Sequence, residues 1–265
     1  MAELITYTIY GIVLGVLILF IFTGLIILKK ASENNSFNLT LLGSSFLGLT
    51  FTYVIIFATE SWPIIITAKF VSYLILIYFI ERTYYKNRKS PFKKVLIFGG
   101  INYSLHMVLS IAINVLFLVE RTTLTRVLGN LLDITMAIVV FFWLGIASFQ
   151  AFKNLEDKEI EPWIKTRIKL VWISSFIMMF AEIPDMIRID PSIPYADFDN
   201  VISLIVFMSQ LAIISVFVVC QSFAWIMPPF LKKFLNRIQN FQFSDKKSSL
   251  TEEEVLNRLK NDLWD

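Results

Sequence analysis

The sequence contains little cysteine, histidine or charge. Cys220 is the only cysteine, which excludes an intrachain disulfide framework. His106 is the only histidine, which weighs against a multi-histidine metal site. Charged residues make up 17% of the 265 residues, below the quarter that is usual in soluble domains, whereas hydrophobic residues make up 56%. With a mean hydropathy of +0.67, this composition is typical of a protein that crosses the bilayer several times.

Seven runs are long and apolar enough to span a membrane. They do not alternate as barrel strands would, and a single span in lipid must satisfy its own backbone groups. We therefore predict an all-α membrane protein, with a seven-transmembrane-helix bundle over residues 1–228. The first run lacks a basic leader, which favours a retained span over a cleaved signal. The predicted spans are residues 5–28, 37–57, 63–80, 95–118, 127–150, 170–189 and 201–228.

Lysine and arginine are divided unevenly between the two sides of the predicted bundle. Of the 24, 20 lie in the first, third and fifth connections or after residue 228, and Lys69 lies within a span. Only Arg121, Arg126 and Arg188 are on the other side. The positive-inside rule predicts a cytoplasmic C-terminus, and an odd number of spans then predicts an N-terminus outside. We expect a multi-pass protein of the plasma membrane, in contact with the lipid bilayer. The net charge of +3 gives no indication of nucleic-acid binding.

Three charged residues fall inside predicted spans, where a charge costs about 3 kcal/mol on insertion scales. From the predicted outer ends and the helical rise, Lys69 and Asp133 lie about 9 Å deep and Glu182 about 10 Å deep. The three come from different spans but share one level. We therefore predict that Lys69 lies within ion-pair reach of Asp133 or Glu182.

Other polar residues cluster near that level. Asn130 is one turn from Asp133, and the same depth argument places Asn114 on span four and Gln210 on span seven near this level. His106 lies nearer the middle of span four. Together with Lys69, Asp133 and Glu182, they are candidate ligand-binding residues. His106 alone is more simply a satisfied core histidine, and amide side chains more often bond between helices than to ligands.

The segment "FAEIPDMIRID" explains how a second acid reaches the mouth of this site. Asp185 and Arg188 continue the Glu182 face in steps of three residues, so Asp185 joins the candidate ligand-binding residues. Pro184 removes one backbone hydrogen bond and predicts a kink in the sixth helix.

Three interpretations of the intramembrane charges remain open: a static brace, a ligand or ion pocket, and a misplaced span boundary. Two carboxylates facing one ammonium leave a surplus negative charge unless burial protonates an acid. Below the Lys69 level, the strongly polar candidates are His106, Gln210 and Gln221. A site closed at its base favours a receptor, whereas a continuous polar route would favour a transporter.

The predicted cytoplasmic tail, residues 229–265, contains two amphipathic segments. Residues 230–242 place apolar side chains on one face, with lysine and arginine beside it, which predicts a juxtamembrane amphipathic helix along the inner leaflet. Thr251 and Glu254 form a capping box, which predicts a short helix over residues 252–264. This helix and the basic loops are the expected contacts for a cytoplasmic protein partner.

The fifth connection, "EPWIKTRIKLVWISSF", and the exit segment, "WIMPPFLKKFLNRI", together with the seven spans, resemble the seven-helix sensor regions found before prokaryotic histidine kinases. They are also similar to archaeal seven-span proteins. The resemblance implies a receptor-like or sensor protein that signals through a partner. The alternatives are a small-solute or ion transporter or channel that uses the same charges, and a purely structural bundle.

Several functional classes are disfavoured by the residues that the chain lacks. A retinal protein would need a buried lysine in the seventh span, which has none, and a three-histidine zinc hydrolase is excluded by the single His106. We expect no enzyme activity and no cofactor. The expected ligand is a small polar or cationic molecule that enters from outside.

Overall fold

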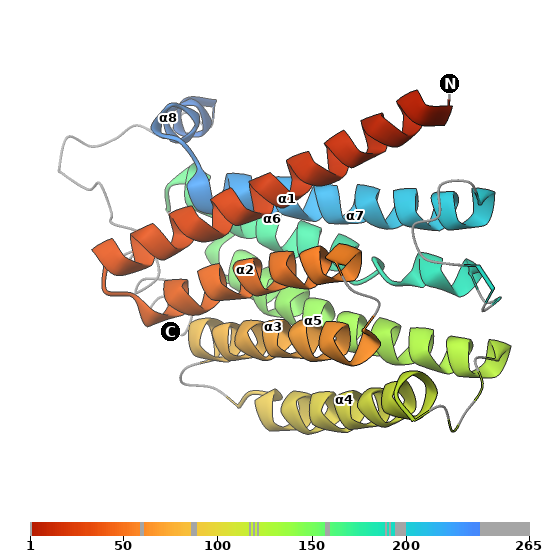
Figure 1. Ribbon diagram of the computed structural model, residues 1–265. Helices are drawn as coiled ribbons and strands as arrows, with labels where there is room; N and C mark the ends of the chain where they lie inside the picture. Colours follow the sequence, from red (N-terminus) through yellow and green to blue (C-terminus); the bar gives the residue numbers. More distant parts are fainter. Residues whose placement is uncertain are drawn as a thin grey trace.

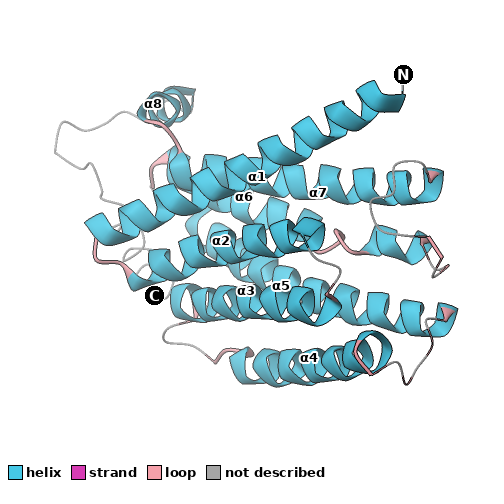
Figure 2. Ribbon diagram, viewed as in Figure 1, coloured by secondary structure: helices cyan, strands magenta, loops and turns pink. Residues whose placement is uncertain are grey.

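The computed structural model describes residues 2–58, 61–85, 89–116, 118, 120, 122–156, 160–188, 190, 192–193 and 200–238. Most of this chain is helical (Figure 2). Seven of its segments are long and apolar enough to cross a membrane, which confirms the predicted all-helical, seven-span bundle. The elements are α1 (Ala2–Glu33), α2 (Phe37–Ala58), α3 (Trp62–Tyr84), α4 (Phe92–Asn114), α5 (Thr123–Glu156), α6 (Pro162–Met178), η1 (Ile183–Ile187), α7 (Val201–Ile226) and α8 (Pro229–Ile238).

The bundle helices alternate in direction, and each packs against the next in the chain (Figure 1). α1 also packs against α7, which closes the ring, and α3 contacts α5 across its centre. We call the end that carries η1 and the starts of α3, α5 and α7 the η1 end. The opposite end, which carries α8, is the α8 end (Figure 1).

The predicted boundaries were wrong at the ends of the first and fifth spans and at the start of the sixth, and α1 continues to Glu33 rather than residue 28. The fourth span differs less. α4 ends at Asn114, and the amides of Val115 and Leu116 both bond to the Ile111 carbonyl as the helix closes. α5 is longer at both ends than the predicted 127–150, because its last turns still bury apolar residues against the bundle, Leu155 among them. α6 begins at Pro162 rather than at residue 170, since proline suits the first turn of a helix.

Small residues allow α2 and α3 to approach each other closely. A Cβ atom built on Gly48 would lie 2.6 Å from the Ser72 Oγ. Any larger residue at position 48 would therefore collide with α3. This contact fixes the spacing of the helix that carries Lys69.

α8 lies in the segment for which an amphipathic helix was predicted. It lies across the direction of the bundle helices (Figure 1), and it runs from Pro229 to Ile238 rather than over 230–242. Leu231 and Leu235 pack against the core, whereas Phe230 and Phe234 are exposed. The remainder of the predicted helix and the capped helix at 252–264 lie outside the described residues.

Candidate functional site

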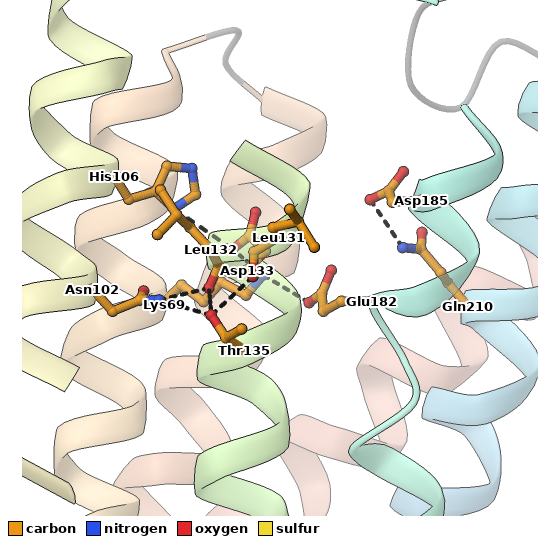
Figure 3. A network of polar contacts seen from close by, with 10 residues as sticks. All are labelled: Lys69, Asn102, His106, Leu131, Leu132, Asp133, Thr135, Glu182, Asp185 and Gln210. Carbon is orange, nitrogen blue, oxygen red and sulfur yellow. Dashed lines mark hydrogen bonds and ion pairs between the residues drawn. The ribbon is translucent and has the colours of Figure 1, made fainter. Parts of the chain in front are cut away.

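Lys69 on α3 bridges two carboxylates from other elements (Figure 3). Its Nζ lies 2.8 Å from the Asp133 Oδ1 on α5 and 2.7 Å from the Glu182 Oε1, just before η1. The prediction that Lys69 reaches one of these acids is confirmed for both. We call Lys69, Asp133, Glu182 and His106 the charge cluster.

The break between α6 and η1 places Glu182 in this cluster. The sequence predicted a kink at Pro184, but the α-helix ends earlier, at Met178. Proline has no N–H, and its ring would collide with the carbonyl of Phe180, four residues back. The intervening backbone therefore changes to bonds that span three residues, such as the Ile183 N–H to the Phe180 carbonyl and the Ala181 N–H to the Met178 carbonyl. Glu182 then precedes the first residue of η1 and faces Lys69 (Figure 3).

His106 brings a fourth ionisable group to the cluster. Its Nδ1 lies 3.9 Å from the Asp133 Oδ1, beyond hydrogen-bond distance, and its side chain is buried. With a neutral histidine and both acids ionised, the cluster carries one surplus negative charge. A proton on His106 or on an acid would neutralise it, as would a bound cation.

Asp185 lies apart from the Lys69 cluster and holds η1 to its neighbours. Its carboxylate accepts hydrogen bonds from Gln210 on α7, at 3.1 Å, and from Arg188, at 2.9 Å. Its backbone carbonyl accepts a bond from the Asn130 side chain on α5, at 2.8 Å. Arg188 is almost fully buried in this clamp. The structure thus brings three of the candidate residues together around Asp185 rather than around Lys69: Asn130, Asp185 and Gln210.

Asn114 is held to its own helix instead. It is the last residue of α4, and its side-chain amide donates to the Ser110 carbonyl at 3.0 Å. The sequence placed it deeper, because the fourth span was predicted to extend to residue 118. The helix end leaves it near the η1 surface of the bundle.

Asn102 belongs to the site's surroundings and was missed by the sequence reasoning. Its amide donates to the Leu132 carbonyl and to the Thr135 Oγ1, both at 3.0 Å, so it ties α4 to the turn of α5 that carries Asp133 (Figure 3). Its spacing of four residues from His106 could have indicated a shared helix face.

A layer of aromatic side chains closes the space beneath the charge cluster. Phe141 follows Asp133 by eight residues, or about 12 Å along α5 toward the α8 end. Its ring lies 5.8 Å from that of Tyr73 and 5.4 Å from that of Phe217. The rings of Phe20 and Phe46 continue the layer at 5.5 to 6.3 Å. This aromatic layer is almost completely buried and draws on five helices: Phe20, Phe46, Tyr73, Phe141 and Phe217.

Polar groups reappear on the far side of the aromatic layer. Gln221 donates to the Ser174 hydroxyl and accepts from the Trp225 indole, each at 2.9 Å. Ser148 donates to the Tyr84 hydroxyl at 3.1 Å. The aromatic layer therefore separates two polar regions of the core.

Arg167 is a buried cation in the α8-side polar region that sequence reasoning assigned to a basic loop. It is 3% exposed, and its guanidinium lies 4.2 Å from the centre of the Trp225 ring, a cation–π contact. The error follows from starting the sixth span at residue 170. Trp163, Ile164, Arg167, Ile168 and Val171 share the buried face of α6, and this helical spacing could have revealed it.

Two cavities accompany these features, and neither is lined by Lys69, Asp133 or Glu182. One, of about 30 Å³, lies beside Tyr53 and Gln210 and has room for about one water molecule. The other, of about 490 Å³, is a lateral groove between α2 and α3. Among the described residues, no group of three or more histidine, cysteine, aspartate or glutamate residues could hold a metal ion.

The arrangement is thus a charge cluster that is clamped at the η1 end and closed toward the α8 end. Comparison of the chain with known protein families, with characterised proteins and with solved structures finds no match.

Proposed function

We propose that this protein is a receptor-like or sensor seven-helix membrane protein. In this proposal the charge cluster takes a small polar or cationic ligand that reaches it from the η1 end. The α8 end meets a cytoplasmic protein partner through its basic surface. Ligand binding acts on the α6–η1 break, because Glu182 is attached to it.

The aromatic layer is the observation that supports this proposal over transport. A transported solute needs a continuous polar route between the two ends of the bundle. Here the Phe141 ring contacts those of Tyr73 and Phe217 beneath the cluster, with centre separations of 5.8 and 5.4 Å. A site closed at its base binds a ligand without passing it on.

Charge supports the ligand class. Lys69 already neutralises one carboxylate, so Asp133 and Glu182 together leave one unit of negative charge in a region from which water is largely excluded. A small cation, or a polar molecule with a cationic group, would offset it. An anion would add to the surplus.

Charge also supports the proposed sidedness. By the spans predicted from the sequence, 20 lysine and arginine residues belong to the connections and tail of the α8 side, with the buried Arg167 among them, against three on the η1 side. The positive-inside rule then favours a cytoplasmic α8 end and an N-terminus outside. In that orientation the charge cluster lies nearer the outer surface of the plasma membrane.

A transporter is the second candidate, and one observation favours it. The α-helical backbone of α6 stops at Met178, and residues 179–182 form turns next to a charged side chain. Interrupted helices of this kind hold ions and substrates in many transporters. A motion that opens the aromatic layer would complete a route.

Charge-displacement recording separates the two candidates. The purified protein is reconstituted in liposomes on a solid-supported electrode, and sodium, potassium, choline and methylammonium chlorides are applied as concentration jumps. A receptor-like site predicts a transient displacement for at least one cation, lost in Glu182→Gln and retained in the exposed control Glu33→Gln. A sustained current that requires Glu182 would support the transporter instead. Complete absence of displacement in the wild type would contradict the proposed site.

A further inference from the structure

The lateral groove between α2 and α3 lies apart from the charge cluster. It has a volume of about 490 Å³, within the range of about 300–1,000 Å³ that is typical of ligand sites. Its walls come from both helices, with Met107 of α4 at one side. Both helices are long and apolar enough to span a membrane. The exposed side chains of Phe51, Ile64 and Val71 beside the groove indicate that it opens on the outside of the bundle, the side that a bilayer would cover.

The groove follows from the spacing of small and large residues on the two helices. Gly48, Phe51 and Ile55 form a row along one face of α2, and Ala68 and Ser72 form a row on α3. The close approach of Gly48 to Ser72 makes its floor, and the larger side chains form its rims. Phe51 and Val71 at the rim are 61% and 48% exposed.

The lining of the groove selects a hydrocarbon occupant. The Thr67 hydroxyl lines the groove nearer the η1 end. It already donates to the Pro63 carbonyl, 2.8 Å away, and lies 3.3 Å from the Tyr103 hydroxyl. The Ser72 hydroxyl at the floor donates to the Ala68 carbonyl at 2.8 Å. A polar ligand would therefore find few partners, whereas an unfilled groove would forfeit dispersion contacts along its walls.

We propose that the α2–α3 groove holds one alkyl chain of a membrane lipid in a fixed position. An alkyl chain gains no hydrophobic free energy when it moves from the surrounding bilayer into the groove. Its preference for the groove over bulk lipid therefore comes from packing against three helices at once. The alkyl chain contacts the face of α3 that carries Ala68 and Val71. Lys69 lies on the same turns of α3, but its side chain extends from another face toward Asp133. This site does not depend on the proposed receptor function.

Photolabelling tests the groove directly. The protein in phosphatidylcholine nanodiscs is irradiated with increasing amounts of a palmitic acid analogue that carries a diazirine on its chain, and labelled peptides are mapped by mass spectrometry. Labelling of the α2–α3 peptides is expected to saturate and to fall when unlabelled palmitic acid is added. Labelling at the exposed Val108 of α4 is expected to rise without saturation, as for a passing lipid.

A matched pair of substitutions completes the test. Ala68→Phe fills the groove and is expected to reduce its labelling about tenfold, equivalent to about 1.4 kcal/mol. Val108→Phe adds the same ring at a lipid-facing position outside the groove and leaves that labelling unchanged. The proposal is overturned if the α2–α3 peptides label linearly and without competition in the wild type, a result that does not require either variant to fold.

Discussion

Lys69 and Glu182 have unequal roles in the charge cluster. Lys69 is the cation for two carboxylates at once, so both acids lose their partner when it is removed. Without the charge of Glu182, however, Lys69 and Asp133 remain as a neutral pair. The two residues can therefore be separated experimentally, one as a structural brace and the other as the source of the surplus charge.

Substitution of Lys69 by methionine is expected to lower the free energy of unfolding by about 3–5 kcal/mol, because it leaves two largely buried carboxylates, with side chains 22% and 15% exposed, without a cation. Thermal and denaturant unfolding in nanodiscs would measure the loss. Lys29→Met, at a side chain that is 76% exposed, is the control and should change stability little.

A charge-neutral variant checks the cause of that loss. The triple substitution Lys69→Met, Asp133→Asn and Glu182→Gln removes all three formal charges, and it should recover most of the stability. If Lys69→Met unfolds at the same temperature as Lys29→Met, the brace role is wrong.

How much of the site could be predicted depended on the kind of residue. Lys69, Asp133 and Glu182 stand out because a charge inside an apolar run is costly, and depth alone was enough to group them. Arg167 and Asn102 did not stand out. Arg167 lies before residue 170, where the sixth span was predicted to begin. Asn102 bonds between helices, but in the sequence nothing distinguishes such an amide from any other.

Among the elements, α6 deviates most from its predicted form. Seven spans could be predicted because each apolar run reaches the length that the bilayer requires. The position of the break in α6 could not be predicted. Pro184 alters the backbone hydrogen bonds back over residues 179–183, and the number of residues that leave the α-helix depends on what the freed backbone packs against. The clamp from Gln210 and Asn130 to Asp185 supplies that packing.

Gly48→Ala is expected to lower the free energy of unfolding by about 1–3 kcal/mol, since the added methyl group would meet the Ser72 Oγ at 2.6 Å. Gly100→Ala on α4 is the matched control, because nothing lies within 4 Å of a Cβ at that position. It should leave stability unchanged or raise it by up to about 1 kcal/mol.

The same measurement distinguishes overpacking from a loss of helix flexibility. Addition of Ser72→Ala to Gly48→Ala removes the colliding oxygen and should restore much of the loss. Equal unfolding temperatures for Gly48→Ala and Gly100→Ala would show that the α2–α3 contact does not constrain stability.

At the scale of the whole molecule, the aromatic layer divides the bundle into two halves, as far as the described residues extend. One half is charged, and the other has neutral hydrogen bonds, a bond from the Lys30 ammonium to the Trp225 carbonyl and one buried arginine. The sequence predicted that the half nearer α8 would hold few charges, and Arg167 is the exception. The aromatic layer itself was not predicted, because 25 phenylalanines in apolar runs give no sign of which ones meet.

The proposed sidedness makes a labelling prediction. In a Cys220→Ser background, Ser192→Cys lies in the connection at the η1 end and Lys89→Cys in one at the α8 end, both at exposed positions. A membrane-impermeant maleimide should label position 192 on intact cells and position 89 only after the membrane is opened. The reverse pattern would contradict an N-terminus outside.

The central claim is that the surplus negative charge beside Lys69 forms a ligand site. It is tested most directly by the thermal unfolding of wild-type, Glu182→Gln and Glu33→Gln proteins in nanodiscs, each with sodium, potassium, choline and methylammonium chlorides at matched ionic strength. We predict that at least one cation stabilises the wild type and Glu33→Gln, by about 2.7 kcal/mol at 100 times its Kd, and that Glu182→Gln stays folded but loses this effect. If Glu182→Gln unfolds and no cation stabilises the wild type, the charges are a static brace and the claim is wrong.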